Sequence, residues 1–336
     1  MVMVMPLDNG QNFGVEVLLA SYEWFKADIL ISCMDVWVLP AHLTSHTRFC
    51  PWIPVDHDPV PEQICASLST ALYPMAFSKW GVGILANANI KAKYVPCSAD
   101  ASVFVRGYKD KSRKAIGVPD ECDFFVSMVA ANKDPGDRKG FGEALQGFAR
   151  FHANHPNSYL YLHTNWNGAV NIGHLCDRLG IRDHVMRPDP YPYLMGMMTP
   201  EYMQTIYSAS DLLLNPAKSE GFGLPVLEAQ MCGTPVALTD FSTSRELLFG
   251  GWMIKGQPDW SIGADSFRLR AYIDSVVGVL EEAYADRGNE LLSLQARKGA
   301  MQLDTEQVFK NYWVPALKDI EEIVEGKGGE LKLVTF

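Results

Sequence analysis

The sequence lacks several features that define common classes of protein. No stretch approaches the roughly 18 apolar residues that a membrane helix needs, so we expect no transmembrane segment. The first ten residues, MVMVMPLDNG, have neither the basic start nor the apolar run of a signal peptide. A basic surplus is also missing, because 29 Lys and Arg residues face 39 Asp and Glu residues. The net charge of −10 therefore argues against a nucleic acid as partner.

Paired cysteines and the commonest catalytic motifs are absent too. The seven cysteines form no CxxC pair and their number is odd, which favours free, buried thiols in a reducing cytoplasm. There is no Walker A sequence, no GxSxG, no HExxH and no G-x-G-x-x-G after a strand. These absences disfavour P-loop nucleotide hydrolysis, α/β-hydrolase chemistry and zinc-protease chemistry.

What the sequence does contain is an alternation of apolar strand patterns and amphipathic helix patterns. With 48 % apolar residues it has ample material for buried cores. This alternation predicts an α/β fold with parallel sheets. We expect strands near 27–32, 48–55, 73–78, 93–96, 123–130, 159–163, 211–216 and 235–238. We expect helices near 62–72, 80–88, 110–117, 140–155, 172–179, 199–209, 224–232, 267–285 and 305–324.

The most informative segment is SEGFGLPVLEA, residues 219–229, which follows a predicted strand and opens a predicted helix. Gly221 and Gly223 allow a ligand to approach the backbone, and the free amides of the first helical turn attract an anion. Glu220 and Glu228 bracket this turn, and a carboxylate can accept from both hydroxyls of a vicinal diol. The pattern suits a ligand with sugars on both sides of a phosphate. The alternative is a tight turn in which Glu228 only complements the helix dipole.

The longer run SEGFGLPVLEAQMCGTPV resembles the E-x7-E segment of family-4 retaining glycosyltransferases. Glu220 and Glu228 stand at the two motif glutamates. The resemblance implies an α/β fold of the GT-B type, with two facing Rossmann-like domains, parallel sheets and a cleft between the domains. It also implies that Glu228 holds the ribose of a nucleotide-sugar donor and that Glu220 lies at the transferred sugar. The amides of Gly221, Phe222, Gly223 and Leu224 would then cover the sugar and diphosphate.

A second block, residues 128–140, is similar to the strand, loop and "KG" helix start of that family. The donor diphosphate needs cations, because the charge of the leaving group grows in the transition state. Lys139 matches the family lysine. Asn132 stands where the family carries an arginine, so Lys133 or Arg138 would supply the missing charge, and the sequence does not choose between them.

Two further residues are candidates by resemblance. His57, in the turn PVDHDP, matches a family histidine that faces the donor sugar, and we count it with Glu220 and Lys139 as catalytic. Tyr191 lies where the family often seats the nucleotide base. Its ring either stacks on the base or simply packs against the protein.

The resemblance also implies how the chain is divided. We place an acceptor-side domain at 1–108, to which about 310–336 would pack back, and a donor-binding domain at 109–309. The acceptor-side domain is short, and no first strand or glycine-rich loop is recognisable before Ala27.

The expected function is transfer of a sugar, with retention, from a nucleotide-diphosphate sugar to a hydroxyl acceptor. The one Asp-x-Asp sequence, Asp56-His57-Asp58, belongs to the turn that resembles the family's histidine turn, and we recognise no loop typical of metal-dependent transferases. We therefore predict no metal and no cofactor besides a UDP-, GDP- or ADP-sugar as donor. Two alternatives stay open, a nucleotide-sugar 2-epimerase of GT-B fold and a non-catalytic nucleotide-sugar binding protein. The sequence identifies neither the acceptor, which can be a saccharide, a lipid-linked or a small molecule, nor the oligomeric state. We expect a cytoplasmic protein, and a peripheral membrane contact stays open.

Overall fold

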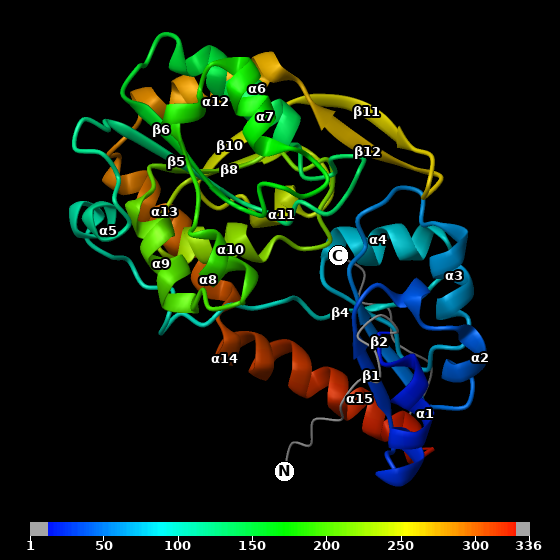
Figure 1. Cartoon of the computed structure of the whole chain (residues 1–336). Coiled ribbons are helices and arrows are strands. Elements are labelled where there is room, and N and C mark those ends of the chain that lie inside the picture. The colour runs from blue at the N-terminus through cyan, green and yellow to red at the C-terminus, as the bar shows by residue number, and fades with distance from the viewer. Residues whose placement is uncertain (1–12, 327–336) are drawn as a thin grey trace. The chain divides into compact units, whose positions relative to one another are not determined.

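The computed structural model describes residues 13–326 and divides the chain into two compact units (Figure 1). The first unit comprises residues 1–96, 261–267 and 308–336, and the second comprises 97–260 and 268–307. The boundaries expected from the sequence lie at 108/109 and 309/310. The expectation that the first ten residues do not form a signal peptide concerns positions outside the described residues.

The first unit contains a parallel sheet whose strands lie in chain order, β1-β2-β3-β4. Its strands are β1 (Leu30–Cys33), β2 (Phe49–Ile53), β3 (Met75–Ala76) and β4 (Lys93–Tyr94). The register pairs Leu30 with Phe49, Trp52 with Met75, and Met75 with Lys93. The helices around this sheet are α1 (Val15–Trp24), η1 (Val36–Val38), α2 (Ala41–Thr44), α3 (Glu62–Leu68) and α4 (Lys79–Asn87).

Strands β2 and β3 in the middle of this sheet are buried on both faces, which explains their apolar residues, whereas Ile31 and Cys33 of the edge strand β1 are exposed. On β2, Phe49 and Ile53 pack against residues of α3 and α4, whereas Cys50 packs against Ala316 and Ile320. Ala316 and Ile320 belong to the closing helical segment, which consists of α14 (Thr305–Val308), η4 (Phe309–Trp313) and α15 (Val314–Val324). The segment is anchored by Asp319, whose carboxylate accepts from Tyr73 Oη at 2.6 Å and from Lys93 Nζ at 2.7 Å.

The second unit is built on a six-stranded parallel sheet of order β10-β9-β8-β5-β6-β7. Its strands are β5 (Phe124–Val129), β6 (Ser158–His163), β7 (Val185–Met186), β8 (Leu212–Asn215), β9 (Val236–Thr239) and β10 (Gly251–Ile254). The chain moves outward from β5 through β6 to β7, then returns to β8 and moves outward on the other side. The strand order therefore reverses between β5 and β8. In open α/β sheets, ligands bind at the carboxyl ends of the strands beside such a point.

Helices cover both faces of the second sheet. One face is covered by α6 (Phe141–His152), α7 (Ile172–Leu179) and α12 (Ile273–Ala285), and the opposite face by α9 (Pro200–Ala209), α10 (Leu224–Met231) and α13 (Glu290–Ala300) (Figure 1). Strand β5 shows the period of two that this sandwich demands, since Phe124 and Val126 face the first layer and Phe125 the second. The remaining elements are α5 (Lys109–Ala115), η2 (Arg182–His184), α8 (Pro190–Leu194), α11 (Ser244–Leu247) and η3 (Met301–Leu303).

Two expectations are wrong, one about the start of a helix and one about the burial of a cysteine. The helix expected over 267–285 begins only at Ile273, because residues 266–271 form a strand, β12 (Ser266–Ala271), which pairs with β11 (Gly256–Ser261). The alternating residues Phe267 to Arg270 fit a strand once a partner is present, and a sequence window does not reveal that partner. The expectation of buried thiols fails for Cys33, which is exposed, although all seven cysteines are free.

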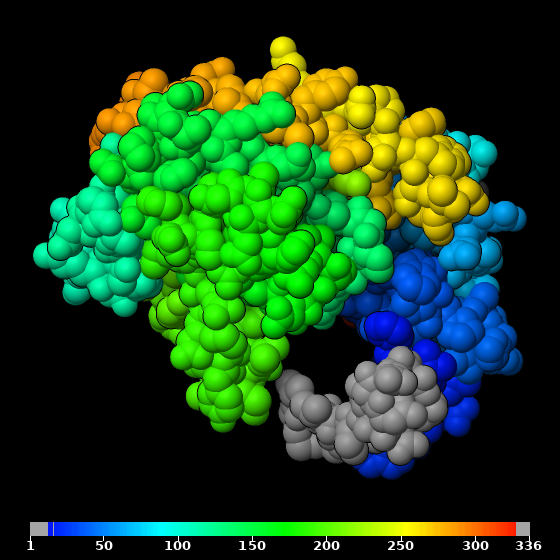
Figure 2. All heavy atoms as spheres, turned by 45° about the horizontal axis from the view of Figure 1, so that its top comes forward, coloured from blue at the N-terminus to red at the C-terminus, as the bar shows by residue number. Residues whose placement is uncertain are grey.

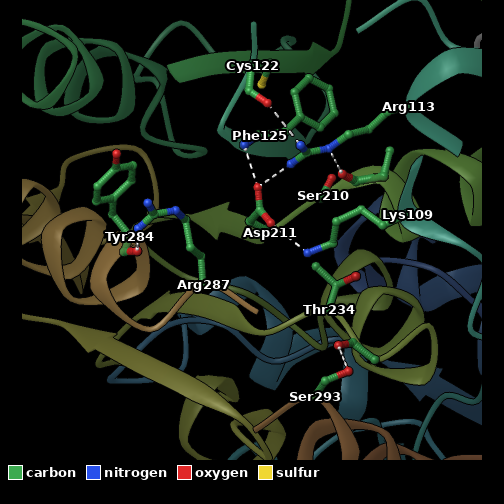
Figure 3. A network of polar contacts seen from close by, with 12 residues as sticks. Lys109, Arg113, Cys122, Phe125, Ser210, Asp211, Thr234, Tyr284, Arg287 and Ser293 are labelled. Carbon is green, nitrogen blue, oxygen red and sulfur yellow. Dashed lines mark hydrogen bonds and ion pairs between the residues drawn. The ribbon is translucent and has the colours of Figure 1, made fainter. Parts of the chain in front are cut away.

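A polar network stabilises the second sheet where β8 begins (Figure 3). The Asp211 carboxylate is 5 % exposed and accepts from Lys109 Nζ at 2.6 Å, from Arg113 at 2.5 Å and from the Phe125 amide at 2.7 Å. Arg113 also donates to the carbonyl of Cys122. The network ties α5 to β5 and β8, and it borders a cavity of about 510 Å³ lined in part by Thr234 and Ser293.

Candidate active site

The segments singled out in the sequence follow the two strands that flank the reversal of strand order. Residues 130–140 follow β5, and residues 216–223 follow β8. Both segments therefore leave the sheet at its carboxyl edge and lie side by side. The cavity beside Asp211 lies at the opposite edge, because Asp211 and Thr234 precede β8 and β9.

Gly140 brings the two segments into contact. It has a φ of +72°, and a Cβ at this position would lie 2.4 Å from the carbonyl oxygen of Pro216. Only glycine tolerates both this left-handed conformation and this close approach. A backbone hydrogen bond from the Lys218 amide to the Arg138 carbonyl, 2.7 Å long, holds the pair of loops together.

This contact places the predicted cations beside the first motif glutamate. Lys139 Nζ lies 2.7 Å from Glu220 Oε1, and both side chains are largely buried, with 17 % and 14 % exposed. Arg138 donates to the carbonyl of Ser219 at 2.9 Å and lies 3.9 Å from Glu220 Oε2. A charged group that bound at Lys139 would therefore also be next to Glu220 and Arg138.

Lys133 and Asn132 have surroundings different from those of Arg138 and Lys139. Lys133 is exposed on the loop after β5. Asn132, which stands at the position of the family arginine, is buried and donates to the carbonyls of Asn165 and Val170 at 2.9 and 2.7 Å. Its side-chain oxygen, Oδ1, accepts from the Val170 amide at 2.8 Å. Asn132 thus fastens the loop after β6 and is committed to the structure of the protein.

The glycine-rich turn has the conformation of an anion-binding site. Gly223 precedes α10 with a φ of +107°, and Pro225 occupies the first turn of the helix. Within residues 13–326, no protein acceptor receives a hydrogen bond from the amides of Gly221, Phe222, Gly223 or Leu224. Four free amides at the start of an eight-residue helix favour negative charge, because their dipoles point toward it.

Two hydroxyl groups that were not among the predicted site residues hold the glycine-rich turn in place through hydrogen bonds. Ser242 Oγ accepts from the Glu220 amide at 3.0 Å, and Thr243 Oγ1 donates to the carbonyls of Glu220 and Phe222 at 3.1 and 2.8 Å. Both residues are buried and lie in the loop between β9, the next strand in the sheet, and α11. A hydroxyl pair after a parallel strand, at the same edge as the turn, is the signal that could have identified them.

Glu228 has a different environment from Glu220. It lies on α10, is partly buried, and Oε2 accepts from the hydroxyl of Tyr207 at 2.7 Å. Burial raises the pKa of Glu228, and the Tyr207 hydrogen bond opposes that rise because it stabilises the ionised form. Glu228 is therefore more than a surface charge that complements the helix dipole.

Tyr191 and His57 belong to neither of the two segments that form this cluster. Tyr191 is on α8 and is 67 % exposed, so the packing alternative is wrong. The green stretch of chain that includes α8 and α9 lies at the surface in the space-filling view (Figure 2). His57 belongs to the first unit, where Nδ1 lies 2.5 Å from Asp56 Oδ1.

Comparisons with known proteins find a family similarity over the segment that carries this site. Residues 109–250 match the model of the family described as "Glycosyl transferases group 1". This stretch contains Lys133, Arg138, Lys139 and both motif glutamates, and it is less than half of the chain.

Individual relatives agree with that match. The chain is 31 % identical over 139 residues to a D-inositol 3-phosphate glycosyltransferase of Mycolicibacterium smegmatis, an alignment that covers 41 % of this chain and 29 % of the relative. It is 30 % identical over 88 residues to an alpha-galactosylglucosyldiacylglycerol synthase of Streptococcus pneumoniae, covering 26 % of this chain and 24 % of the relative. The chain thus spans about a third or less of these curated relatives.

Solved structures extend the likeness to nearly the whole chain. Sucrose-phosphate synthase from Thermosynechococcus elongatus superimposes with a TM-score of 0.69 at 15 % identity, over 96 % of this chain and 80 % of that one. Anabaena HepE in complex with UDP and glucose gives a TM-score of 0.68 at 15 % identity, over 96 % and 84 %. These likenesses confirm the expected GT-B α/β fold with parallel sheets.

Two negative findings concern the described residues alone. Between residues 13 and 326, no helix is both long and apolar enough to cross a bilayer. In the same part of the chain, no three His, Cys, Asp or Glu side chains gather closely enough to hold a metal ion. The predicted independence from a metal stays a prediction.

Proposed function

We propose that this chain is a retaining, metal-independent glycosyltransferase of family 4 that transfers a hexosyl group from a nucleotide-diphosphate sugar to a hydroxyl acceptor. The observation that carries the proposal is the cluster of Lys139, Arg138 and Glu220 beside four free amides, at the reversal of strand order. Cations and amides suit a diphosphate, and carboxylates suit sugar hydroxyls. The family match covers the same residues.

In this proposal each group has a defined task. Lys139 and the amides of residues 221–224 hold the diphosphate and stabilise its charge as the bond to the sugar breaks. Glu220 binds hydroxyls of the transferred sugar, and Glu228 accepts from both ribose hydroxyls. His57, a candidate by resemblance, supports the sugar, and Tyr191, with its exposed ring, stacks on the base.

Arg138 rather than Lys133 replaces the missing family arginine in this proposal. Arg138 lies at the turn, 3.9 Å from Glu220, whereas Lys133 is exposed on the preceding loop. Replacing each by alanine tests the assignment. Arg138→Ala should lower kcat/KM about 100-fold, the size of effect expected for one charge-stabilising group, and Lys133→Ala should leave it within about threefold. Equal effects of the two changes would contradict the assignment.

The decisive experiment is incubation with a panel of sugar nucleotides. UDP-sugars come first, because Anabaena HepE is described in complex with UDP-glucose, and GDP- and ADP-sugars follow. Acceptors should include saccharides, lipid-linked glycans and D-inositol 3-phosphate, the compound named in the curated relatives. Release of nucleotide with formation of a glycoside supports the proposal. Interconversion of the donor without an acceptor would indicate an epimerase, and binding without turnover a non-catalytic protein.

Two variants link the activity to the site. Glu220→Ala should abolish transfer with a modest loss of nucleotide binding, because its carboxylate faces the sugar. Lys139→Ala should weaken donor binding and turnover together, because its charge contacts the diphosphate in both states. Activity that survived both changes would overturn the proposal.

A further inference from the structure

Tyr207 is a buried residue whose polar atom points at the proposed donor site. It lies in the last turn of α9, and its side chain is fully buried. Its hydroxyl donates to Glu228 Oε2 at 2.7 Å. Within the described part of the chain, the Glu228 carboxylate has no other hydrogen-bond donor and no Lys, Arg or His nitrogen within 4.0 Å. The phenol is therefore what fixes the direction of this carboxylate.

The surroundings of Tyr207 hold it rigidly. Thr234 Oγ1 donates to the Tyr207 carbonyl at 2.6 Å, and Thr234 is itself buried. The Phe104 ring lies with its centroid 6.2 Å from that of Tyr207. Helices α9 and α10 are in contact, so the hydroxyl bridges two packed helices. A donor on a packed helix keeps its partner in place better than one on a loop.

A phenol suits this task better than a cation would. Burial and the nearby Glu228 carboxylate hold the pKa of Tyr207 well above its usual range, so the group stays neutral and keeps its proton. The hydrogen bond restricts the rotamers of Glu228 while the carboxylate keeps its negative charge. Oε1 is left for other donors, and Oε2 still has accepting capacity.

We propose that Tyr207 is a positioning residue of the donor site, whose hydroxyl orients the Glu228 carboxylate so that it accepts both ribose hydroxyls. This inference rests on the proposed role of Glu228. It assigns a role to a residue that lies outside the E-x7-E motif, on helix α9, which packs against α10. Tyr207 does not touch the substrate; it acts through Glu228.

Nucleotide binding by calorimetry tests the proposal with Tyr207→Phe in the full chain. The probes are UDP, GDP and ADP and their 2′-deoxy counterparts. We expect wild type to bind one of the three ribonucleotides about tenfold more tightly than its 2′-deoxy form. In Tyr207→Phe, the affinity for the ribonucleotide should fall about tenfold, the size of one hydrogen bond to a charged group. The affinity for the 2′-deoxy form should change much less.

Tyr159→Phe is the matched control. Tyr159 is also buried and its hydroxyl also donates to a glutamate, Glu121, at 2.8 Å. Glu121 precedes β5 and is therefore at the opposite edge of the sheet from the turn. Tyr159→Phe should leave the preference for ribose intact. An equal loss in both variants would show a general packing effect and overturn the proposal.

A double variant and a pH profile supply readouts that a purely structural role would not move. In the Glu228→Ala background, Tyr207→Phe should have no further effect on nucleotide affinity, since its partner is gone. In Tyr207→Phe alone, the acid-side loss of affinity should begin at higher pH, because Glu228 loses the donor that favours its ionised form. Additive effects in the double variant would overturn the proposal.

The outcomes separate this inference from the proposed function. If wild type binds none of the three nucleotides, the proposed function fails and this inference fails with it. If wild type binds one of the nucleotides but binds its 2′-deoxy form equally well, the proposed role of Glu228 in binding the ribose is wrong. The proposed role of Tyr207 in orienting Glu228 for the ribose is then wrong as well. If wild type prefers ribose and Tyr207→Phe behaves like wild type, only the role of Tyr207 is wrong.

Discussion

Glu220 and Glu228 belong to one motif and have seven residues between them, yet the structure gives them different electrostatic surroundings. Glu220 contacts the ammonium of Lys139 at 2.7 Å and has the guanidinium of Arg138 nearby. Among residues 13–326, the one hydrogen-bond donor to the Glu228 carboxylate is the neutral phenol of Tyr207. A carboxylate among cations suits a place where charge develops, whereas a carboxylate held by a neutral donor suits steady hydrogen bonding. The contrast teaches that one motif can combine two different tasks.

The largest expected effect comes from removing the charge of Glu220 alone. Glu220→Gln keeps the volume but breaks the ion pair with Lys139, so the ammonium loses the partner that holds it at the turn. We expect kcat to fall about 10²- to 10³-fold, as for a group that acts in the transition state. The affinity for nucleotide, measured by calorimetry, should change less than tenfold. A fall in affinity equal to the fall in kcat would place Glu220 in ground-state binding instead.

Asp211 offers a second ion-paired carboxylate, at the other edge of the same sheet. Asp211→Asn leaves Lys109 and Arg113 without their shared partner, and breaking such a buried pair costs about 3 kcal/mol of unfolding free energy. Denaturant titration should show this loss. The kcat of the folded variant should stay within about threefold of wild type, in contrast to Glu220→Gln. A loss of kcat without a loss of stability would mean that the network near the cavity takes part in the reaction.

Glu228→Gln should affect binding rather than turnover. An amide accepts through one oxygen only, so one of the two expected ribose hydrogen bonds is lost. We expect the KM for the donor to rise about tenfold, with kcat nearly unchanged. Glu228→Asp, which keeps the charge but shortens the side chain, is the companion variant. If Glu228→Gln lowers kcat as much as Glu220→Gln does, the proposed division of tasks is wrong.

The sequence predicted the parts of the site that are local in the chain. The run around Gly221 and Gly223 carries its own turn, helix start and carboxylates, so the position of Glu220 before α10 followed directly. Eight of the ten strands of the two parallel sheets followed as well, because their apolar runs are bounded by polar turns, but β7 and β10 were not among the expected strands. Gly180 ends α7 and Thr199 begins α9 as their residue types indicate, since Gly180 has a φ of +69° and Thr199 Oγ1 accepts from the Tyr202 amide.

The rest depends on contacts between distant segments. Lys139 reaches Glu220 because Gly140 packs on Pro216, and no local pattern states that approach. Tyr207 was not singled out from the sequence, because only the packing of α9 on α10 turns its hydroxyl toward Glu228. Ser242 and Thr243 support the turn from the next strand. Strand β12 was mistaken for helix because its pairing partner, β11, was not recognised.

The smallest expected effect concerns stability, where the two glutamates should again differ. Burial raises the pKa of Glu228 in the folded chain, so folding takes up a proton there and the stability linked to it is present at acid pH and lost as pH rises through the folded pKa. Glu228→Gln removes the ionisation and should therefore raise the unfolding free energy at pH 8 by about 1 kcal/mol or less, with no gain at pH 4. Glu220→Gln should give no such gain, because it deletes the partner of Lys139. Thermal unfolding of both variants at the two pH values measures the difference, and a stabilisation of Glu228→Gln that did not depend on pH would show that desolvation of its charge is not the cause.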